Sequence, residues 1–330
     1  MTWPPEGTAQ AVSPHALPWP WAAPRSERST LRNMKVGLQI SSFTWPGGPE
    51  AIGPTLARIV READDVGFDS IWVMDHFFQI RGNGRIEEPM LEGMTALGFM
   101  AAHSARARLG LMVGGVHYRH PGMWVKATTT LDVLSGGRAW LGIGAAWNAE
   151  ESRALAFPFP PLGVRFELLE ETLLIAHGMF QGERGSEETF RGRHYEAERL
   201  LNSPQAISRP RIPIMVGGGG ERKTLRLVAQ YADACNVFGR PEGIARKYAI
   251  LDAHCAEVGR DPGEIERSTL QDVRLAIGGG SGESAAEVVE RFGDLSDAGA
   301  QHVIVDLKAV HEPERLDVFG GDVIPHLREL

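Results

Sequence analysis

The chain has only two cysteines among its 330 residues, Cys235 and Cys255, and they are not spaced as a metal-binding pair. This scarcity disfavours a disulfide framework or a zinc site and is typical of a reducing cytoplasm, where we expect the protein to reside. No segment offers the ~20 consecutive apolar residues that a membrane-spanning helix requires. No run of basic residues occurs, and the formal net charge is -8. We therefore expect neither a nucleic acid nor a membrane as a partner.

The first 33 residues differ in composition from the rest, because prolines alternate there with Trp3, Trp19 and Trp21. This stretch has neither the basic start nor the continuous apolar core of a secretory signal. Met34 directly precedes an apolar run that is typical of a first β-strand. We interpret residues 1–33 as a disordered extension or as a segment that precedes the natural start at Met34. Residues 34–330 are predicted to form the folded domain.

Apolar runs typical of buried strands alternate with helical patterns from Met34 onward, in a chain with 43% hydrophobic and 23% charged residues. Such alternation indicates βαβ units and a parallel sheet with right-handed crossovers. Strands are predicted at residues 36–40, 70–74, 109–113, 139–143, 212–216, 234–238, 269–276 and 302–306. Helices are predicted between them, for example at residues 55–66, 89–105, 123–134 and 165–180.

Eight strands favour an α/β fold of the (β/α)8 TIM-barrel class. A doubly wound open sheet is the rival, but no Gly-x-Gly-x-x-Gly follows the first strand to begin a dinucleotide site. The fourth and fifth strands are separated by roughly seventy residues, and connections of that length are usually functional. We predict an insertion after strand four that forms a lid over the barrel mouth.

Polar and small residues follow four of the predicted strands, at the end of the barrel where such enzymes carry their active site. Small residues leave room for a large planar ligand to approach the backbone, while the few polar groups provide specificity. These residues are Asp75 and His76, Gly114 and Gly115, Trp147 and Asn148, and the glycines at 217–220.

Several of these residues also have a purely structural interpretation. The place of His76 at a strand end favours a functional role over a structural histidine. Asp75 fits a loop cap as well as a ligand contact, and Asn148 fits a helix cap as well as a substrate wall beside Trp147. The glycines at 217–220 fit either a phosphate site, with charge added by Arg222, or a flexible turn.

A histidine-rich segment follows the third predicted strand, at residues 117–120. Its spacing lacks the His-x-His of barrel metallohydrolases, and no carboxylate accompanies it in the sequence. We therefore predict no metal site.

Four motifs carry a resemblance to a known family. They are Met-Asp-His-Phe at 74–77, Tyr-Arg-His-Pro at 118–121, Leu-Asp-Val-Leu-Ser-Gly-Gly-Arg at 131–138 and Leu-Gly-Ile-Gly-Ala-Ala-Trp-Asn at 141–148. From Met34 to about the C-terminus, the chain resembles the luciferase-like monooxygenase superfamily, and within it the deazaflavin-dependent oxidoreductases.

The resemblance implies a (β/α)8 barrel that binds the deazaflavin coenzyme F420, or alternatively FMN, at the carboxyl ends of the strands. It implies that His76 moves a substrate proton while hydride passes to the ring. A bulge with a non-prolyl cis peptide is expected near Val113 and Gly114, behind the ring. Cofactor contacts are expected from Asp75, Val113, Gly114, Gly115, Ala145, Asn148, Gly217, Gly218, Gly219 and Arg222. Substrate contacts are expected from Ser42, Trp45 and Trp147.

One departure limits what the resemblance implies about the substrate. The sugar phosphate dehydrogenases of this branch carry glutamates directly after strand four, where this chain has Trp147 and Asn148. No specific substrate is therefore carried over, beyond a small molecule. The resemblance also implies a homodimer or a higher homo-oligomer.

Three functions are compatible with these patterns. The leading hypothesis is an F420-dependent hydride transferase with His76 as its acid or base. An FMN-dependent monooxygenase that uses molecular oxygen is the second. A non-catalytic flavin-binding protein is the third, from another class. The intact His76 and the small residues Gly114, Ala145 and Gly217 disfavour the third.

Overall fold

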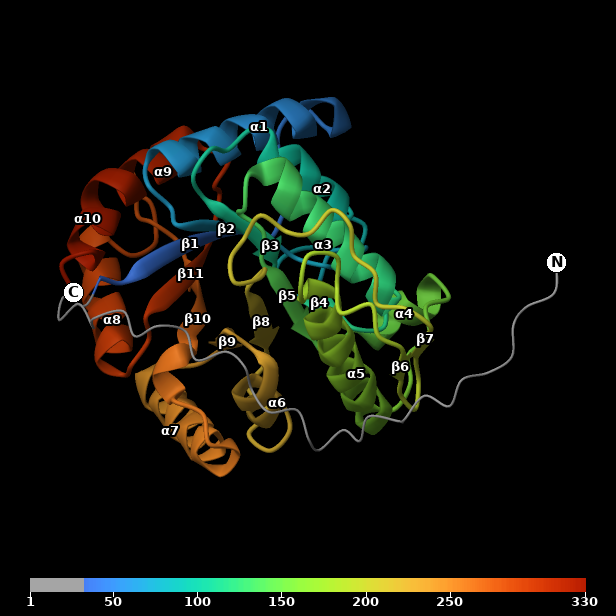
Figure 1. Ribbon diagram of the computed structural model, residues 1–330. Helices are drawn as coiled ribbons and strands as arrows, with labels where there is room; N and C mark the ends of the chain where they lie inside the picture. The colour runs from blue at the N-terminus through green and yellow to red at the C-terminus, as the bar shows by residue number, and fades with distance from the viewer. Residues whose placement is uncertain (1–32) are drawn as a thin grey trace, which may run out of the picture.

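A computed structural model describes residues 33–330 and contains a closed barrel of parallel strands surrounded by helices (Figure 1). Residues 1–32 lie outside the described residues, and with them the expectation that the extension is disordered or precedes the natural start at Met34. The barrel strands are β1 (Lys35–Ile40), β2 (Ser70–Val73), β3 (Arg108–Leu111), β4 (Gly114–Gly115), β5 (Leu141–Gly144), β8 (Ile214–Gly217), β9 (Ala234–Val237), β10 (Glu266–Val273) and β11 (His302–Leu307).

The barrel closes because β3 and β4 are two parts of one strand. β3 pairs with β2, and β4 pairs with β5, so the two ends of the sheet belong to the same stretch of chain. The N–H of Leu109 donates to the carbonyl of Arg138 at 2.8 Å, and the N–H of Trp140 donates to the carbonyl of Leu109 at 2.8 Å. Counted in this way the barrel has eight strands, and the predicted (β/α)8 class is confirmed.

Helices cover the outside of the barrel in chain order (Figure 1). Proline in the first turn begins α1 and α3, where its missing N–H is not needed, and Ser284 with Glu287 forms a capping box at α8. None of the helices in residues 33–330 is long and apolar enough to cross a bilayer. The covering helices are α1 (Pro49–Asp65), α2 (Gly93–Ala101), α3 (Pro121–Ser135), α5 (Leu162–Phe180), α6 (Thr224–Tyr231), α7 (Pro241–Val258), α8 (Ala285–Asp297), α9 (Pro313–Val318) and α10 (Ile324–Leu327).

Two hydrophobic clusters stabilise this arrangement. The larger one lies between the strands and the helices, where whole strands such as β2 and β11 are buried. The smaller one fills the barrel and comprises Trp72, Met112, Trp140, Met215, Ala234 and Ile304. Each fully buried large side chain contributes roughly 1.5–3 kcal/mol relative to an exposed one. The barrel is therefore a packed core, and its ligands can bind only at an end of the strands.

The predicted strands agree with the structure except at particular ends. β10 begins at Glu266, three residues before the predicted start at Thr269. Glu266 is charged, but it lies at the amino end of the barrel, where it accepts hydrogen bonds from His302 at 2.8 Å and from Lys35 at 2.6 Å. The second predicted helix is shorter than expected, because Glu92 caps α2 through the N–H groups of Met94 and Thr95.

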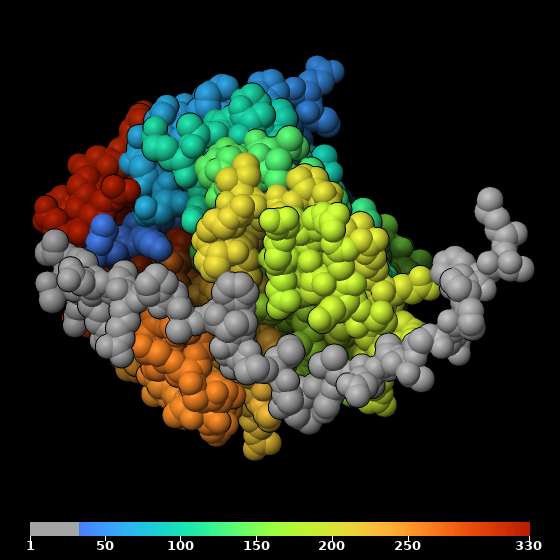
Figure 2. All heavy atoms as spheres, viewed as in Figure 1, coloured from blue at the N-terminus to red at the C-terminus, as the bar shows by residue number. Residues whose placement is uncertain are grey.

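The insertion after β5 divides into two parts. Its first part, at residues 145–161, includes α4 (Ala149–Ala154) and lies beside the loop that follows β2. Its later part contains the antiparallel hairpin β6 (Phe190–Arg191) and β7 (Glu196–Ala197). Figure 2 shows this later part in yellow-green and yellow on one face of the molecule.

The later part of the insertion packs on the outside of the barrel. Glu171 of α5 accepts hydrogen bonds from the N–H groups of Arg193 at 2.6 Å and Tyr195 at 2.9 Å. Asp132 of α3 likewise accepts from the N–H groups of Ile207 at 2.7 Å and Ser208 at 2.9 Å. The predicted lid is thus wrong for residues 181–213, because these contacts fix the segment to α3 and α5.

Candidate active site

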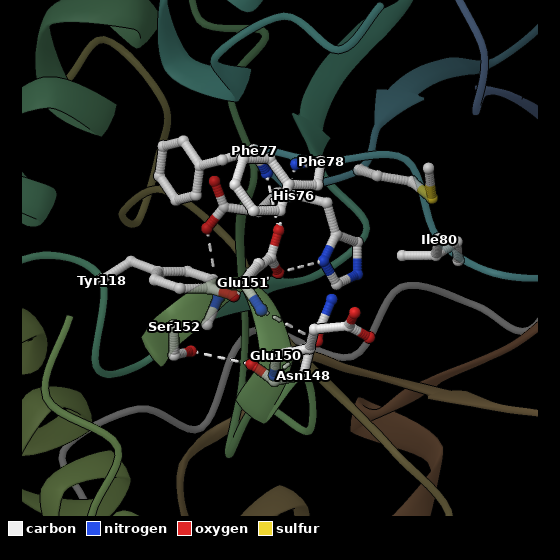
Figure 3. Close-up of polar contacts among 12 residues, drawn as sticks. His76, Phe77, Phe78, Ile80, Tyr118, Asn148, Glu150, Glu151 and Ser152 are labelled. Carbon is white, nitrogen blue, oxygen red and sulfur yellow. Dashed lines mark hydrogen bonds and ion pairs between the residues drawn. The ribbon is translucent and has the colours of Figure 1, made fainter. Parts of the chain in front are cut away.

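His76 lies directly beyond β2, at the carboxyl end of the barrel (Figure 3). Its Nδ1 is 2.5 Å from Oε1 of Glu151, and the imidazole is 14% exposed whereas the side chain of Glu151 is 0% exposed. The indole of Trp147 packs edge-on against the imidazole, with ring centroids 5.4 Å apart. Nε2 of His76 has no hydrogen-bond partner among residues 33–330. One ring nitrogen is therefore held by the protein and the other is free.

The carboxylate of Glu151 accepts hydrogen bonds from three further donors. These are the phenol of Tyr118 at 2.5 Å and the N–H groups of Phe77 at 2.8 Å and Phe78 at 3.2 Å. Burial alone would raise the pKa of Glu151, but the hydrogen bonds from His76 and Tyr118 outweigh it and hold this pKa below its usual value. Burial, together with Glu151 itself, raises the pKa of Tyr118. Glu151 is thus an anion and Tyr118 a neutral donor.

Asp75 is engaged by neighbouring residues and does not face an open site. Its side chain is 1% exposed and accepts two hydrogen bonds from Arg119, at 2.6 and 2.7 Å, and one from the N–H of Gly115 at 3.1 Å. Arg119 also contacts Glu92. Asp75 therefore fixes Arg119 to the strand end at Gly115, and its contact with the cofactor stays a prediction.

A bulge with the cis peptide Met112–Val113 separates β3 from β4, at the place that the resemblance implies. A methyl group at Gly217 would lie 2.6 Å from Cγ2 of Val113, and one at Gly144 would lie 3.0 Å from the same atom. A methyl group at Gly114 would lie 2.2 Å from the ring of Trp124. Three neighbouring strand ends thus present backbone and the valine instead of large side chains, as a flat ligand requires.

The glycines at 217–220 end β8 and form the loop that follows it. α6 begins at Thr224, after a turn at residues 221–223. The N–H groups of Gly219 and Gly220 have no hydrogen-bond acceptor within the described part of the chain. Nζ of Lys247, on α7, donates to the carbonyl of Gly219 at 2.8 Å. Free amides beside a cation suit an anionic group such as a phosphate.

Arg222, a predicted cofactor ligand, follows this glycine loop and is exposed. No hydrogen bond or ion pair of its side chain to residues 33–330 is found, so it is available to a ligand. Its contact with the cofactor stays a prediction, as do those of Val113, Gly114, Gly115, Ala145, Gly217, Gly218 and Gly219.

Asn148 caps α4, one of its two expected roles. Its Oδ1 accepts from the N–H groups of Glu150 at 3.1 Å and Glu151 at 3.4 Å, which fixes the helix that carries Glu151. Its contact with the cofactor ring stays a prediction. Trp147, which precedes it, is 63% exposed beside His76 and is available as the predicted substrate wall.

Two further residues were predicted to line the substrate pocket. Ser42 follows β1 and is partly exposed, so its role stays a prediction. Trp45 is 7% exposed and packs against Phe43 at a centroid distance of 5.5 Å, within the main hydrophobic cluster. Trp45 is therefore part of the hydrophobic core, and its contact with substrate stays a prediction.

Three functional neighbours were missed from the sequence. Glu151, Arg119 and Lys247 each lie far along the chain from the residue that they contact: His76, Asp75 and the glycine loop, respectively. A residue that reaches the site only through the tertiary fold leaves no pattern in the sequence around the site residue that it contacts.

The histidine-rich segment at 117–120 does not converge on a common point. His117 contacts the hydroxyl of Ser152 at 2.8 Å, while the ring of His120 lies 5.3 Å from that of Tyr195. Among residues 33–330, no group of three or more His, Cys, Asp or Glu side chains is placed to hold a metal ion.

His117 makes the stability of the protein depend on pH. Burial, together with the charge of Arg165, lowers the pKa of His117 from 6.5 to about 4. The unfolded chain therefore binds a proton at His117 between about pH 6.5 and 4, whereas the folded chain does not. Since the unfolded state then binds more protons, the free energy of unfolding falls as pH falls through this range.

We expect the His117→Gln variant, which keeps a donor for Ser152, to lose less stability than the wild type between pH 7 and pH 4. Thermal unfolding of both proteins across this range measures the difference. His177, whose pKa is also lowered to about 4, titrates equally in both and cancels. Parallel curves for the two proteins would show that His117 carries no such pH dependence.

The sequence matches the model of the luciferase-like monooxygenase family over residues 34–316. The chain belongs to this family. It is 31% identical over 196 residues to the F420-dependent glucose-6-phosphate dehydrogenase of Nakamurella multipartita, a match that covers 58% of this chain. The match spans only 54% of that relative's length. The predicted family is confirmed, and it is a family of enzymes.

Two solved structures show the same fold. The coenzyme F420-dependent tetrahydromethanopterin reductase of Methanopyrus kandleri has a TM-score of 0.73 at 17% identity, covering 89% of this chain and 99% of that one. An F420-dependent secondary alcohol dehydrogenase in complex with an F420–acetone adduct has a TM-score of 0.74 at 16% identity, with the same coverage. At these identities the likeness supports the barrel and leaves the substrate of this chain open.

Proposed function

We propose that this protein is an F420-dependent oxidoreductase in which His76 exchanges a proton with a small organic substrate. The free Nε2 of His76, at the carboxyl end of the barrel, is the observation that carries the proposal. The names of the F420-dependent relatives and structural neighbours support the choice of cofactor.

The residues at the barrel mouth fit such a cofactor in two ways. A flat ring can lie against these strand ends, because no large side chain projects there from Val113, Gly144 or Gly217. The unpaired amides of Gly219 and Gly220, beside Lys247 and the exposed Arg222, suit the anionic tail. When bound there, the deazaflavin supplies hydride transfer at its ring.

The chain's own residues perform the proton chemistry. His76 takes a proton from the substrate at Nε2, or returns one there, and the buried carboxylate of Glu151 stabilises the positive charge that the ring acquires. Trp147 lies beside the imidazole and shields it from bulk water on one side.

The alternative is an FMN-dependent monooxygenase, which the family name also covers. Oxygen dependence separates the two functions. With F420 supplied and a substrate found by screening alcohols, aldehydes and amines, we expect anaerobic turnover to equal turnover in air, read from the loss or gain of deazaflavin absorbance. Turnover with FMN that stops when oxygen is removed would contradict the proposal. The homo-oligomer and the cytoplasmic location stay predictions.

A further inference from the structure

We propose that Glu151 is a positioning residue that fixes His76 in the Nδ1–H tautomer and leaves Nε2 as the proton acceptor. The inference rests on the proposed function for its catalytic meaning, whereas the tautomer itself is a property of the chain alone.

The hydrogen bonds that the carboxylate of Glu151 accepts require this tautomer. The anionic carboxylate can only accept, and its partners Tyr118, Phe77 and Phe78 all donate to it. His76 reaches the same carboxylate through Nδ1 at 2.5 Å, so Nδ1 carries the proton. Neutral imidazole has only one N–H, so in the neutral form of His76 Nε2 holds the lone pair.

Glu151 is itself held rigidly, as a positioning residue must be. Four donors hold its carboxylate in one orientation. The cap from Asn148 holds the first turn of α4, which carries Glu151. Three aromatic rings pack together beside it: Phe77 lies 4.9 Å from Phe157 and 5.1 Å from Tyr118, and Tyr118 lies 5.2 Å from Phe157, between centroids. Excluding water in this way strengthens each hydrogen bond to the carboxylate.

The contact between His76 and Glu151 also joins two segments that are distant in sequence. His76 follows β2, while Glu151 lies on α4, in the insertion after β5. No other ion pair of the described residues links His76 to the protein. The orientation of His76 therefore depends on the first part of the insertion, although nothing in the local sequence around His76 indicates it.

The tautomer can be read without cofactor or substrate, by nitrogen-15 NMR of histidine-labelled protein at a pH at which the His76 ring is neutral. In the wild type we expect the His76 signals, identified by their loss in His76→Ala, to report Nδ1–H and an unprotonated Nε2. In Glu151→Gln, whose amide can donate as well as accept, both tautomers should be populated. Glu150→Gln is the matched control, because Glu150 is exposed, and its spectrum should equal that of the wild type.

Kinetics of the F420-loaded enzyme form the second measurement. Glu151→Gln should lower kcat by about tenfold or more with little change in KM, since orientation is lost and binding is not. In the His76→Ala background the same substitution should add nothing, because Glu151 acts only through His76.

An Nε2–H tautomer in the wild type, or a tautomer unchanged in Glu151→Gln, would overturn the inference whether or not F420 is the cofactor. An additive loss of kcat in the double variant would likewise overturn it. If the NMR outcome holds and His76→Ala remains fully active, the proposed function fails and the tautomer assignment stands.

Discussion

Replacing His76 by alanine is expected to lower kcat by about 10²- to 10⁴-fold, the usual contribution of one positioned acid or base. In the proposed function the free Nε2 of His76 exchanges the proton, and removing it leaves Glu151 with no means to reach the substrate. The affinity for F420 should stay within about twofold, because the proposed cofactor contacts lie at other strand ends.

His103→Ala is the matched control for this substitution. His103 follows α2 on the outside of the barrel, where it contacts Phe99 and Arg61, so its loss should leave kcat unchanged. Steady-state kinetics and an F420 titration of the three proteins test the expectation. A His76→Ala enzyme as fast as the wild type would remove His76 from the mechanism.

Replacing Asp75 by alanine is expected to lower the free energy of unfolding by about 3–5 kcal/mol, because it leaves the buried Arg119 without its bidentate partner. The side chains of Asp75 and Arg119 are 1% and 10% exposed, so water cannot replace the lost carboxylate. The N–H of Gly115 loses its acceptor as well. Urea denaturation followed by circular dichroism measures the change.

Asp65→Ala is the control for an exposed ion pair. Asp65 is 78% exposed and lies 3.5 Å from Arg106, and such pairs contribute about 0–1 kcal/mol. A loss below about 1 kcal/mol for Asp75→Ala, together with weaker F420 binding, would contradict this structural role and favour Asp75 as a cofactor ligand.

The barrel could be predicted because its strands are buried on both faces and therefore appear as apolar runs. β2 and β11 illustrate this, since every residue in both is buried. The start of β10 could not be predicted, because Glu266 joins an ion network with Lys35 and His302 that forms only when distant strands meet.

Only those site residues that directly follow a strand could be predicted from the sequence. His76 could be identified because it follows an apolar strand directly, a local pattern. The partners of Asp75 and His76, namely Arg119 and Glu151, are 44 and 75 residues away in sequence, and long-range pairing is decided by the fold. The burial of Trp45 could not be predicted either, since its position after β1 did not reveal that it packs on Phe43.

The central claim is that the barrel mouth binds F420 and places its ring beside His76. Equilibrium titration of the purified protein with F420 and with FMN, followed by the fluorescence and absorbance of each cofactor, tests it most directly. We expect F420 to bind at least about tenfold more tightly than FMN, a difference of about 1.4 kcal/mol. Tighter binding of FMN, or no binding of F420, would contradict the account.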